Sequence, residues 1–330
     1  MKEILSYLFE KNTLNQQEAK ETLIQMGQGK FSDPEIASFL TVYLMRDITA
    51  EELGGFREAL LDLSVQIDMS DYSTIDVCGT GGDEKNTFNI STLTAFVLAG
   101  AGIKVVKHGN YAVSSACGSS NILEHFGYKF SNDPAKLRRE IEQVNLCYLH
   151  APLFHPAMKF VGPVRKSLKL KTFFNLLGPL VNPTRPKNQL AGVFSEKVID
   201  LYHQVFLNAG VNHYIVYSLD GYDEISLTAD FRAVSEKEDL LYSPEILGFE
   251  RIRANEIFGG ANVKEAAAIF SDILEGKGTT AQADVVIANA CFGIKCFFPE
   301  KSIEDCLSMA RESVESRKAL EVLTNLIRLQ

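Results

Sequence analysis

The order of hydrophobic and polar positions divides this chain into two parts. In residues 1–66, apolar side chains recur at spacings of three and four, which is the period of one face of a helix. From about residue 73, short apolar runs alternate with helical stretches, as in α/β proteins. The pattern predicts a helical domain of four short helices at 1–66 and an α/β domain at 73–330. The helical spacing is clearest at Ile36, Phe39, Leu40, Tyr43 and Leu44.

Three sites in the first part carry signals for the start of a helix. Asn15 and Thr49 each stand three residues before a glutamate, which is the spacing of a capping box. Asp33 precedes Pro34, so we expect Asp33 to cap a helix that has proline at its first position.

The second part predicts a central, mainly parallel sheet flanked by helices, because buried runs alternate with helical segments such as 133–144 and 195–208. The last third reads as mostly helical, after two short strands near 231–234 and 240–242. The other expected strands are 74–77, 103–106, 146–149, 190–194 and 214–218.

Composition narrows the class of protein. The 330 residues are 46% hydrophobic, and no apolar run is long enough to span a membrane. The N-terminus lacks the layout of a signal peptide, so we expect a cytoplasmic protein. Six scattered cysteines without a CxxC pair predict free thiols. A net charge of −9 opposes binding to nucleic acid.

A glycine-rich segment at 76–83 stands between a predicted strand and a predicted helix. Its glycines, Gly79, Gly81 and Gly82, let the backbone approach a ligand closely, and the following helix offers free N–H groups and a favourable dipole. This arrangement is typical of a phosphate cradle, although an ordinary turn with a helix cap has the same local pattern.

A second segment of this kind, 107–120, follows the next predicted strand. Lys107 can place a charge on phosphate, Asn110 is both donor and acceptor, and Ser119 and Ser120 begin a helix. Two such units in tandem suggest a ligand with two separated phosphate groups.

The motifs together resemble the anthranilate phosphoribosyltransferases of tryptophan biosynthesis along nearly the whole chain. The resemblance rests on Asp76-x-x-Gly-Thr-Gly-Gly-Asp83, Asn89-Ile-Ser-Thr92, Lys107-His-Gly-Asn110 with Ser114-Ser115, and Asn175-Leu-Leu-Gly-Pro-Leu-x-Asn-Pro183. It implies transfer of phosphoribose from 5-phosphoribosyl diphosphate to the amine of anthranilate, with Mg²⁺ as cofactor. It also implies a homodimer formed through the helical domain, and a segment near 165–185 that returns to that domain.

The resemblance assigns site residues by position. No catalytic acid or base is assigned, because positioning and leaving-group stabilisation carry such a reaction. The donor diphosphate is expected at Gly79, Gly82, Asp83, Thr87, Asn89, Ile90, Ser91, Thr92, Lys107, Ser115 and Ser119. Anthranilate is expected at Gly79, His108, Asn110 and Arg165, and magnesium at Ser91, Asp223 and Glu224.

The roles of Asp223, Glu224 and Arg165 can also be judged from their residue types alone, without the resemblance. Adjacent carboxylates after a strand suit magnesium, but they equally fit a solvated acidic turn. A guanidinium suits the carboxylate of an aromatic acid, but arginine is most often an exposed helix charge.

Three positions depart from the pattern expected of the family. Tyr111 and Lys171 stand where arginine is common, and Glu84 stands where glycine is more usual. Tyr111 removes one phosphate contact, and Glu84 adds negative charge near the predicted anion site.

Two other functions fit parts of the pattern. Pyrimidine nucleoside phosphorylases share the general architecture, but the chain lacks their Thr-Gly-Gly-Thr-x-Asp-Lys-Leu-Glu signature. The other is a non-catalytic nucleic-acid-binding relative, which the negative charge and the intact Asp223-Glu224 pair oppose.

Overall fold

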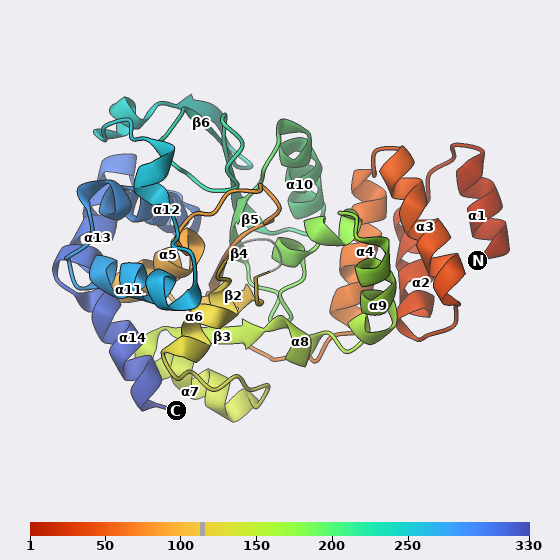
Figure 1. Ribbon diagram of the computed structural model, residues 1–330, viewed down its shortest axis with the longest axis horizontal. Helices are drawn as coiled ribbons and strands as arrows, with labels where there is room; N and C mark the ends of the chain where they lie inside the picture. Colours follow the sequence, from red (N-terminus) through yellow and green to blue (C-terminus); the bar gives the residue numbers. More distant parts are fainter. Residues whose placement is uncertain (113–115) are drawn as a thin grey trace.

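The computed structural model describes residues 1–112 and 116–330 and shows an elongated molecule with helices at one end and a sheet at the other (Figure 1). The N-terminal helices are α1 (Lys2–Phe9), α2 (Gln16–Gly27), α3 (Asp33–Met45) and α4 (Ala50–Asp62). Both predicted capping boxes are confirmed, since the side chains of Asn15 and Thr49 accept from the amides of Glu18 and Glu52.

The predicted start of α3 was wrong by one residue. The helix begins at Asp33 itself, and its cap is Ser32. Glu35 accepts hydrogen bonds from the Ser32 backbone amide, at 2.9 Å, and from the Ser32 hydroxyl, at 2.8 Å. A glutamate at the third helical position therefore selects the serine as the cap.

Within the described residues the sheet has seven strands in the order β3-β2-β1-β4-β5-β6-β7. The strands β1 to β5 are parallel, and β6 and β7 add an antiparallel hairpin at one edge. The mainly parallel sheet is therefore confirmed. The strands are β1 (Ile75–Gly79), β2 (Val105–Gly109), β3 (Leu146–His150), β4 (Asn188–Gly192), β5 (Asn212–Ser218), β6 (Phe231–Val234) and β7 (Asp239–Tyr242).

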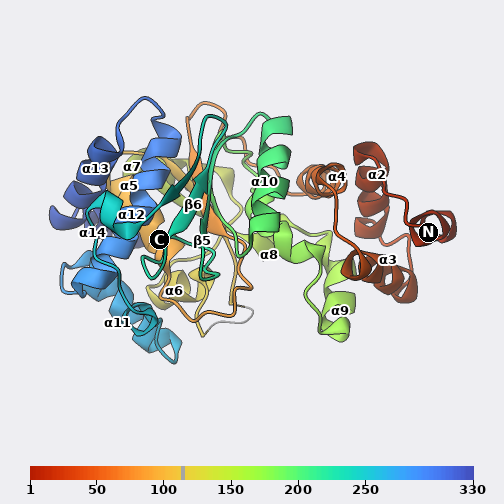
Figure 2. The same cartoon turned by 90° about the horizontal axis from the view of Figure 1, so that it is seen from above.

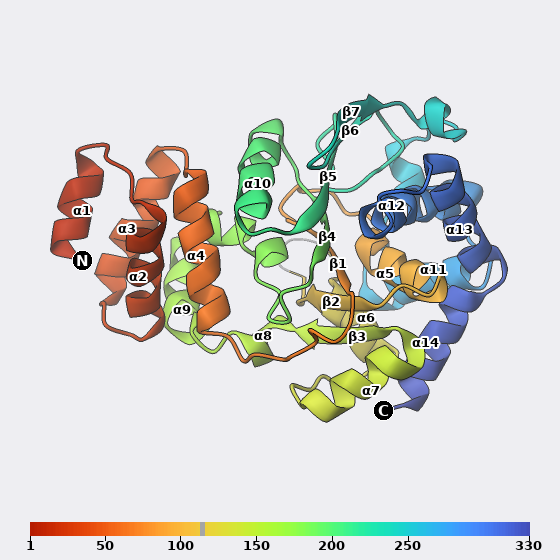
Figure 3. The same ribbon diagram turned by 180° about the vertical axis from the view of Figure 1, so that it is seen from behind.

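Helices cover both faces of the sheet, as the views from above and behind show (Figures 2 and 3). Side chains along each strand point alternately to the two faces of the sheet, so the strands contribute to a hydrophobic core on each face. Val77 and Leu190 belong to the core beneath α5 and α12, whereas Ala191 belongs to the core shared with α10 and the N-terminal helices. The helices after β1 are α5 (Ile90–Gly100), α6 (Ser119–His125), α7 (Pro134–Val144), α8 (Ala151–Phe154), α9 (Met158–Leu168), α10 (Glu196–Asn208), α11 (Val263–Leu274), α12 (Thr280–Phe297), α13 (Ile303–Glu315) and α14 (Lys318–Arg328).

The chain leaves the sheet after β3 and packs α9 against α2 and α3. Two 3₁₀ turns, Phe173–Leu176 and Gly178–Leu180, then lead it back to β4. The Phe173 ring stacks on Phe56 with centroids 4.5 Å apart and makes edge contacts with Phe39 and Tyr43. These aromatic contacts fix the segment that carries Arg165 to the helical end.

Across residues 1–112 and 116–330, we find no helix with the length and apolar character needed to cross a membrane.

Two neighbouring glycines in α4 provide a test of this packing. An added Cβ at Gly55 would overlap the Gln16 carbonyl oxygen of α2, whereas one at Gly54 would sit 3.7 Å from its nearest neighbours. We expect Gly55→Ala to lower the free energy of unfolding by about 1–3 kcal/mol, because α2 and α4 must separate. Gly54→Ala should raise it by up to about 1 kcal/mol through helix propensity. Urea denaturation followed by circular dichroism measures both, and a Gly55→Ala protein as stable as the parent would contradict the close contact.

Candidate active site

Several of the predicted site residues gather where the strand order changes direction, namely Gly79, Ser91, Lys107, Asp223 and Glu224. From β1 the chain builds outward through β2 and β3 on one side, and it resumes with β4 on the other side of β1. Gly79 and Gly192 are paired in register at the carboxyl ends of β1 and β4. Loops leaving these two ends diverge, which is where ligands bind in open α/β sheets.

The segment that follows β5 reaches into this point. A Cβ atom on Gly79 would overlap the Asp223 carboxylate, and one on Gly192 would overlap the Asp223 carbonyl oxygen. The Asp223 carboxylate accepts a hydrogen bond of 2.6 Å from the amide of Gly81. The glycine at position 79 therefore admits Asp223, a role that the sequence reasoning did not foresee, and Gly192 was missed altogether.

Asp223 contacts the glycine loop, which comprises residues 80–89 between β1 and α5, and Glu224 contacts the start of α5, although the two carboxylates are adjacent in sequence. Gly221, at φ +91°, turns the chain just before them. Glu224 Oε1 accepts from the Ser91 amide at 3.2 Å, at the start of α5. Among the described residues, the buried Glu224 Oε2 has no hydrogen-bond partner. This geometry favours a ligand site over a solvated turn.

The protonation of this pair reflects its burial. Burial, with the nearby charge of Asp83, raises the pKa of Asp223 to about 7. Burial and the Asp223 charge raise the pKa of Glu224 well above its usual value, while Lys107 opposes that shift. The Lys107 ammonium donates to the Val77 carbonyl at 2.7 Å and lies 3.4 Å from Ser91 Oγ. An added cation would therefore favour the ionised carboxylates.

Within the described ranges, no cluster of three or more His, Cys, Asp or Glu side chains is arranged to hold a metal. The available donor set is two carboxylates and the Ser91 hydroxyl, with one carboxylate oxygen unpartnered. Hard oxygen donors of this kind fit Mg²⁺ when phosphate and water complete the shell.

A segment far along the chain also supports the glycine loop. The Asn86 side chain donates to the Gly260 carbonyl at 2.9 Å, and the Gly259 amide donates to the Asn86 carbonyl at 2.8 Å. Thr87 forms an isolated bridge with Phe258. This support was not predicted, and its local signal in the sequence is the Gly259-Gly260 pair.

The second polar loop lies beside the first. The Asn89 amide group donates to the Cys117 carbonyl at 3.0 Å and so links the two loops. Ser119 Oγ lies 2.7 Å from the Tyr148 hydroxyl, and the Asn110 side chain is exposed. Ile90 and Thr92 are buried in the first turn of α5, so that they could offer a ligand only backbone groups. Ser115 lies outside the described residues.

His108 lies in a buried polar cluster. Its Nδ1 is 3.3 Å from the Gly178 carbonyl, and its Nε2 is 3.3 Å from Nε2 of His155. Burial and the neighbouring His155 lower the pKa of His108 to about 3, and burial lowers that of His155 to about 4. Both imidazoles are neutral at pH 7, so they suit a pocket wall and not a proton donor.

Arg165 projects from α9 in the returning segment. Its guanidinium packs over the Phe174 ring, 5.0 Å from the centroid, and its Nη2 lies 3.4 Å from Asn175 Oδ1. Burial lowers the pKa of Arg165 from its usual value. A partly desolvated arginine of this kind is suited to a planar carboxylate.

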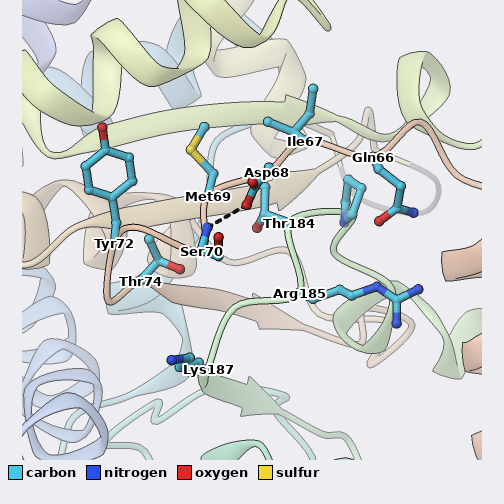
Figure 4. Close-up of a pocket in the computed structure, with 11 residues that line it drawn as sticks. Gln66, Ile67, Asp68, Met69, Ser70, Tyr72, Thr74, Thr184, Arg185 and Lys187 are labelled. Carbon is cyan, nitrogen blue, oxygen red and sulfur yellow. Dashed lines mark hydrogen bonds between the residues drawn. The ribbon is translucent and has the colours of Figure 1, made fainter.

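A separate groove of about 300 Å³ lies at the opposite, amino ends of β1 and β4 (Figure 4). Its lining includes Thr74, Thr184 and Arg185, and it contains none of the predicted site residues.

Comparisons with known proteins agree with this geometry. Residues 71–320 match the glycosyl transferase family α/β domain, and residues 2–64 match its helical bundle domain. The chain is 50% identical over 329 residues to an anthranilate phosphoribosyltransferase from Bacteroides fragilis, covering 100% of this chain and 99% of that protein. It is 53% identical over 329 residues, with the same coverage, to the enzyme of that name from Flavobacterium psychrophilum.

Solved structures agree as well. The crystal structure of the anthranilate phosphoribosyltransferase from Thermus thermophilus has a TM-score of 0.93 and 31% identity, covering 98% of each chain. The enzyme from Saccharomyces cerevisiae in complex with PRPP and Mg has a TM-score of 0.88 and 26% identity, covering 96% of this chain and 93% of that one. On the strength of its full-length relatives and its two matching domains, this chain belongs to the anthranilate phosphoribosyltransferases of the glycosyl transferase family.

Proposed function

We propose that this chain transfers the phosphoribosyl group of 5-phosphoribosyl diphosphate to the amine of anthranilate, in tryptophan biosynthesis. The observation that carries the proposal is the placement of the Asp223 and Glu224 carboxylates. Both accept hydrogen bonds from backbone amides of the glycine loop and α5 at the β1/β4 switch point. The relatives that bear this activity in their names match the chain over its full length.

The donor diphosphate would lie against the glycine loop and the start of α5. Gly82, Asp83, Thr87 and Asn89 line the loop, and Lys107 places its ammonium beside Ser91. Backbone N–H groups and a helix N-terminus stabilise negative charge that develops on a leaving diphosphate. Ser119 and Ser115 belong to the second loop and are proposed contacts for the donor's other phosphate.

Mg²⁺ would be held by Asp223, Glu224 and Ser91, and it would neutralise charge on the diphosphate. The unpartnered Glu224 Oε2 supports this assignment. Burial raises the pKa of Asp223 to about 7, and a bound cation would favour its ionised form, so that metal binding and proton release would be coupled.

Anthranilate would lie towards α9. Arg165 would bind its carboxylate, and His108, Asn110 and Gly79 would shape the remaining wall. The aromatic amine is a free base at neutral pH, so attack on C1 of the ribose requires no strong base from the protein. The lowered pKa values of His108 and His155, about 3 and about 4, make both imidazoles weak bases, which is consistent with a reaction that needs no strong base. The chain's contribution is then positioning.

We also propose that the domains divide at 1–66 and 73–330, with the segment near 165–185 joined to the helical domain. The packing of α9 against α2 and α3 supports the division. Exposed apolar side chains on α1 and α3, among them Phe9 and Met45, at 66% and 83% exposure, support a homodimer through this domain. Light scattering should give twice the chain mass of 36.6 kDa, and a monomer at micromolar concentration would contradict the dimer.

The direct test is loss of anthranilate fluorescence when the phosphoribosyl donor and Mg²⁺ are added together. We expect loss only when all components are present. Phosphate-dependent release of thymine or uracil from a nucleoside, without anthranilate consumption, would instead indicate a pyrimidine nucleoside phosphorylase.

The metal assignment predicts a specific double variant. Asp223→Asn with Glu224→Gln should abolish the magnesium dependence of donor binding and strongly depress turnover, because both carboxylate ligands are lost. Calorimetry with and without Mg²⁺ measures this directly. Magnesium-dependent binding equal to that of the parent protein would leave the pair as an acidic turn.

The acceptor assignment predicts a selective kinetic effect. Arg165→Ala should raise the KM for anthranilate about 10- to 100-fold, because a charge-assisted hydrogen bond is lost, and should change the donor KM far less. Lys166→Ala, on the same helix, is the matched control. Unchanged anthranilate kinetics in Arg165→Ala would remove Arg165 from the site.

A further inference from the structure

Two of the residues that depart from the family pattern, Glu84 and Lys171, contact each other. The Lys171 ammonium donates to Glu84 Oε1 at 2.8 Å and to the Gly82 carbonyl at 2.7 Å. Lys171 stands just after α9, in the segment that carries Arg165, and Gly82 and Glu84 belong to the glycine loop. The contact therefore joins the proposed acceptor side to the proposed donor loop.

Glu84 occupies a demanding backbone position. The φ angle of Glu84 is +61°, which lies in the left-handed region that favours glycine. Gly82, two residues earlier, has a φ of +79°. A residue with a side chain in this conformation costs free energy, which contacts with the surrounding structure must offset. The Lys171 contacts hold both residues from the outer side of the loop, while Asp223 holds the Gly81 amide from the inner side at 2.6 Å.

Glu84 also adds a carboxylate to a loop expected to receive an anion. Asp223 and Glu224 are already buried beside this loop, and besides burial the charge of Asp83 raises the pKa of Asp223, while the charges of Asp223 and Asp83 raise that of Glu224. The hydrogen bond and charge of Lys171 lower the pKa of Glu84, so this carboxylate is ionised at neutral pH. Lys171 is placed to offset that charge.

We propose that Lys171 is a positioning residue for the donor loop: it anchors the Gly82 carbonyl and neutralises Glu84, so that a loop with an additional carboxylate still accepts a diphosphate. The inference rests on the proposed function. The two ion-paired side chains are 54% and 77% exposed, so the pair contributes little to global stability. Its effect is expected in donor binding, where an uncompensated charge repels the ligand.

Lys171→Met keeps the length of the side chain and removes the charge. We expect it to raise the donor KM about three- to tenfold at low salt, with kcat changed less than twofold. The increase should shrink as ionic strength rises, because the repulsion is screened. Lys171→Arg should restore the donor KM to within about twofold of the parent. Lys166→Met is the matched control, since Lys166 lies on α9 in the same segment, whereas the contacts with Gly82 and Glu84 are made by Lys171.

Glu84→Gln separates the charge from the anchor. This variant keeps the contact of Lys171 with Gly82 and removes the repelling charge, so the donor KM should stay equal or fall. The double variant Lys171→Met/Glu84→Gln should bind the donor better than Lys171→Met alone. A double variant no better than Lys171→Met, or a Lys171→Met effect that does not depend on salt, would overturn the charge compensation.

Hydrogen exchange in the substrate-free protein tests the anchor without relying on activity. Lys171→Met should speed exchange of the Gly81 amide several-fold, because the loop loses its outer support, while Lys166→Met should leave it unchanged. Equal exchange in Lys171→Met and the parent would overturn the anchoring role. If the parent failed to consume anthranilate, the proposed function would fall, and this measurement would still decide whether Lys171 holds the loop.

Discussion

The burial of two adjacent carboxylates at the β1/β4 switch point is the constraint on which the site depends. Asp223 and Glu224 reach this point because Gly79 and Gly192 leave room for the Asp223 segment. The backbone amides of Gly81 and Ser91 then donate hydrogen bonds to the two carboxylates. A side chain at either glycine would displace the acidic segment. The amides of Gly81 and Ser91 would then lose the carboxylates that accept their hydrogen bonds. The position of the glycine loop and the position of the acidic pair therefore depend on each other.

Local signals predicted much of the fold. Capping boxes at Asn15 and Thr49, strand periods and the turn chemistry at Gly221 depend on residues a few positions apart, and the structure follows them. The predicted start of α3 was wrong because two neighbouring residues, Ser32 and Asp33, can both cap a helix. Glu35 favours Ser32, since it accepts a hydrogen bond from the Ser32 amide.

Support from distant segments could not be read in the same way. Gly192 is a plain strand end in sequence, and its importance appears only when Asp223, 31 positions later in the chain, is seen above it. The bonds that join Gly259 and Gly260 to Asn86 in the glycine loop span more than 170 positions. Glu84 and Lys171 appeared as separate departures from the family pattern, and their contact comes from the path of the chain through α9. The resemblance supplied candidate ligand residues, whereas the residues that position them emerged from tertiary contacts.

The electrostatics of the acidic pair connect the metal to the donor. Two carboxylates without a cation are held in a buried position, where burial raises the pKa of both, the charge of Asp223 raises that of Glu224 further, and Lys107 only partly offsets the Glu224 shift. A divalent ion would relieve the repulsion, yet two carboxylates and a hydroxyl leave most of an octahedral shell unfilled. The diphosphate of the donor brings oxygen ligands, but it also brings negative charge into a loop that already contains Asp83 and Glu84. Neither ligand suits the site well alone, because the ion lacks ligands and the diphosphate meets carboxylates. Together each removes the obstacle to the other, and the same charge balance explains why a cation on the outer side of the loop matters there.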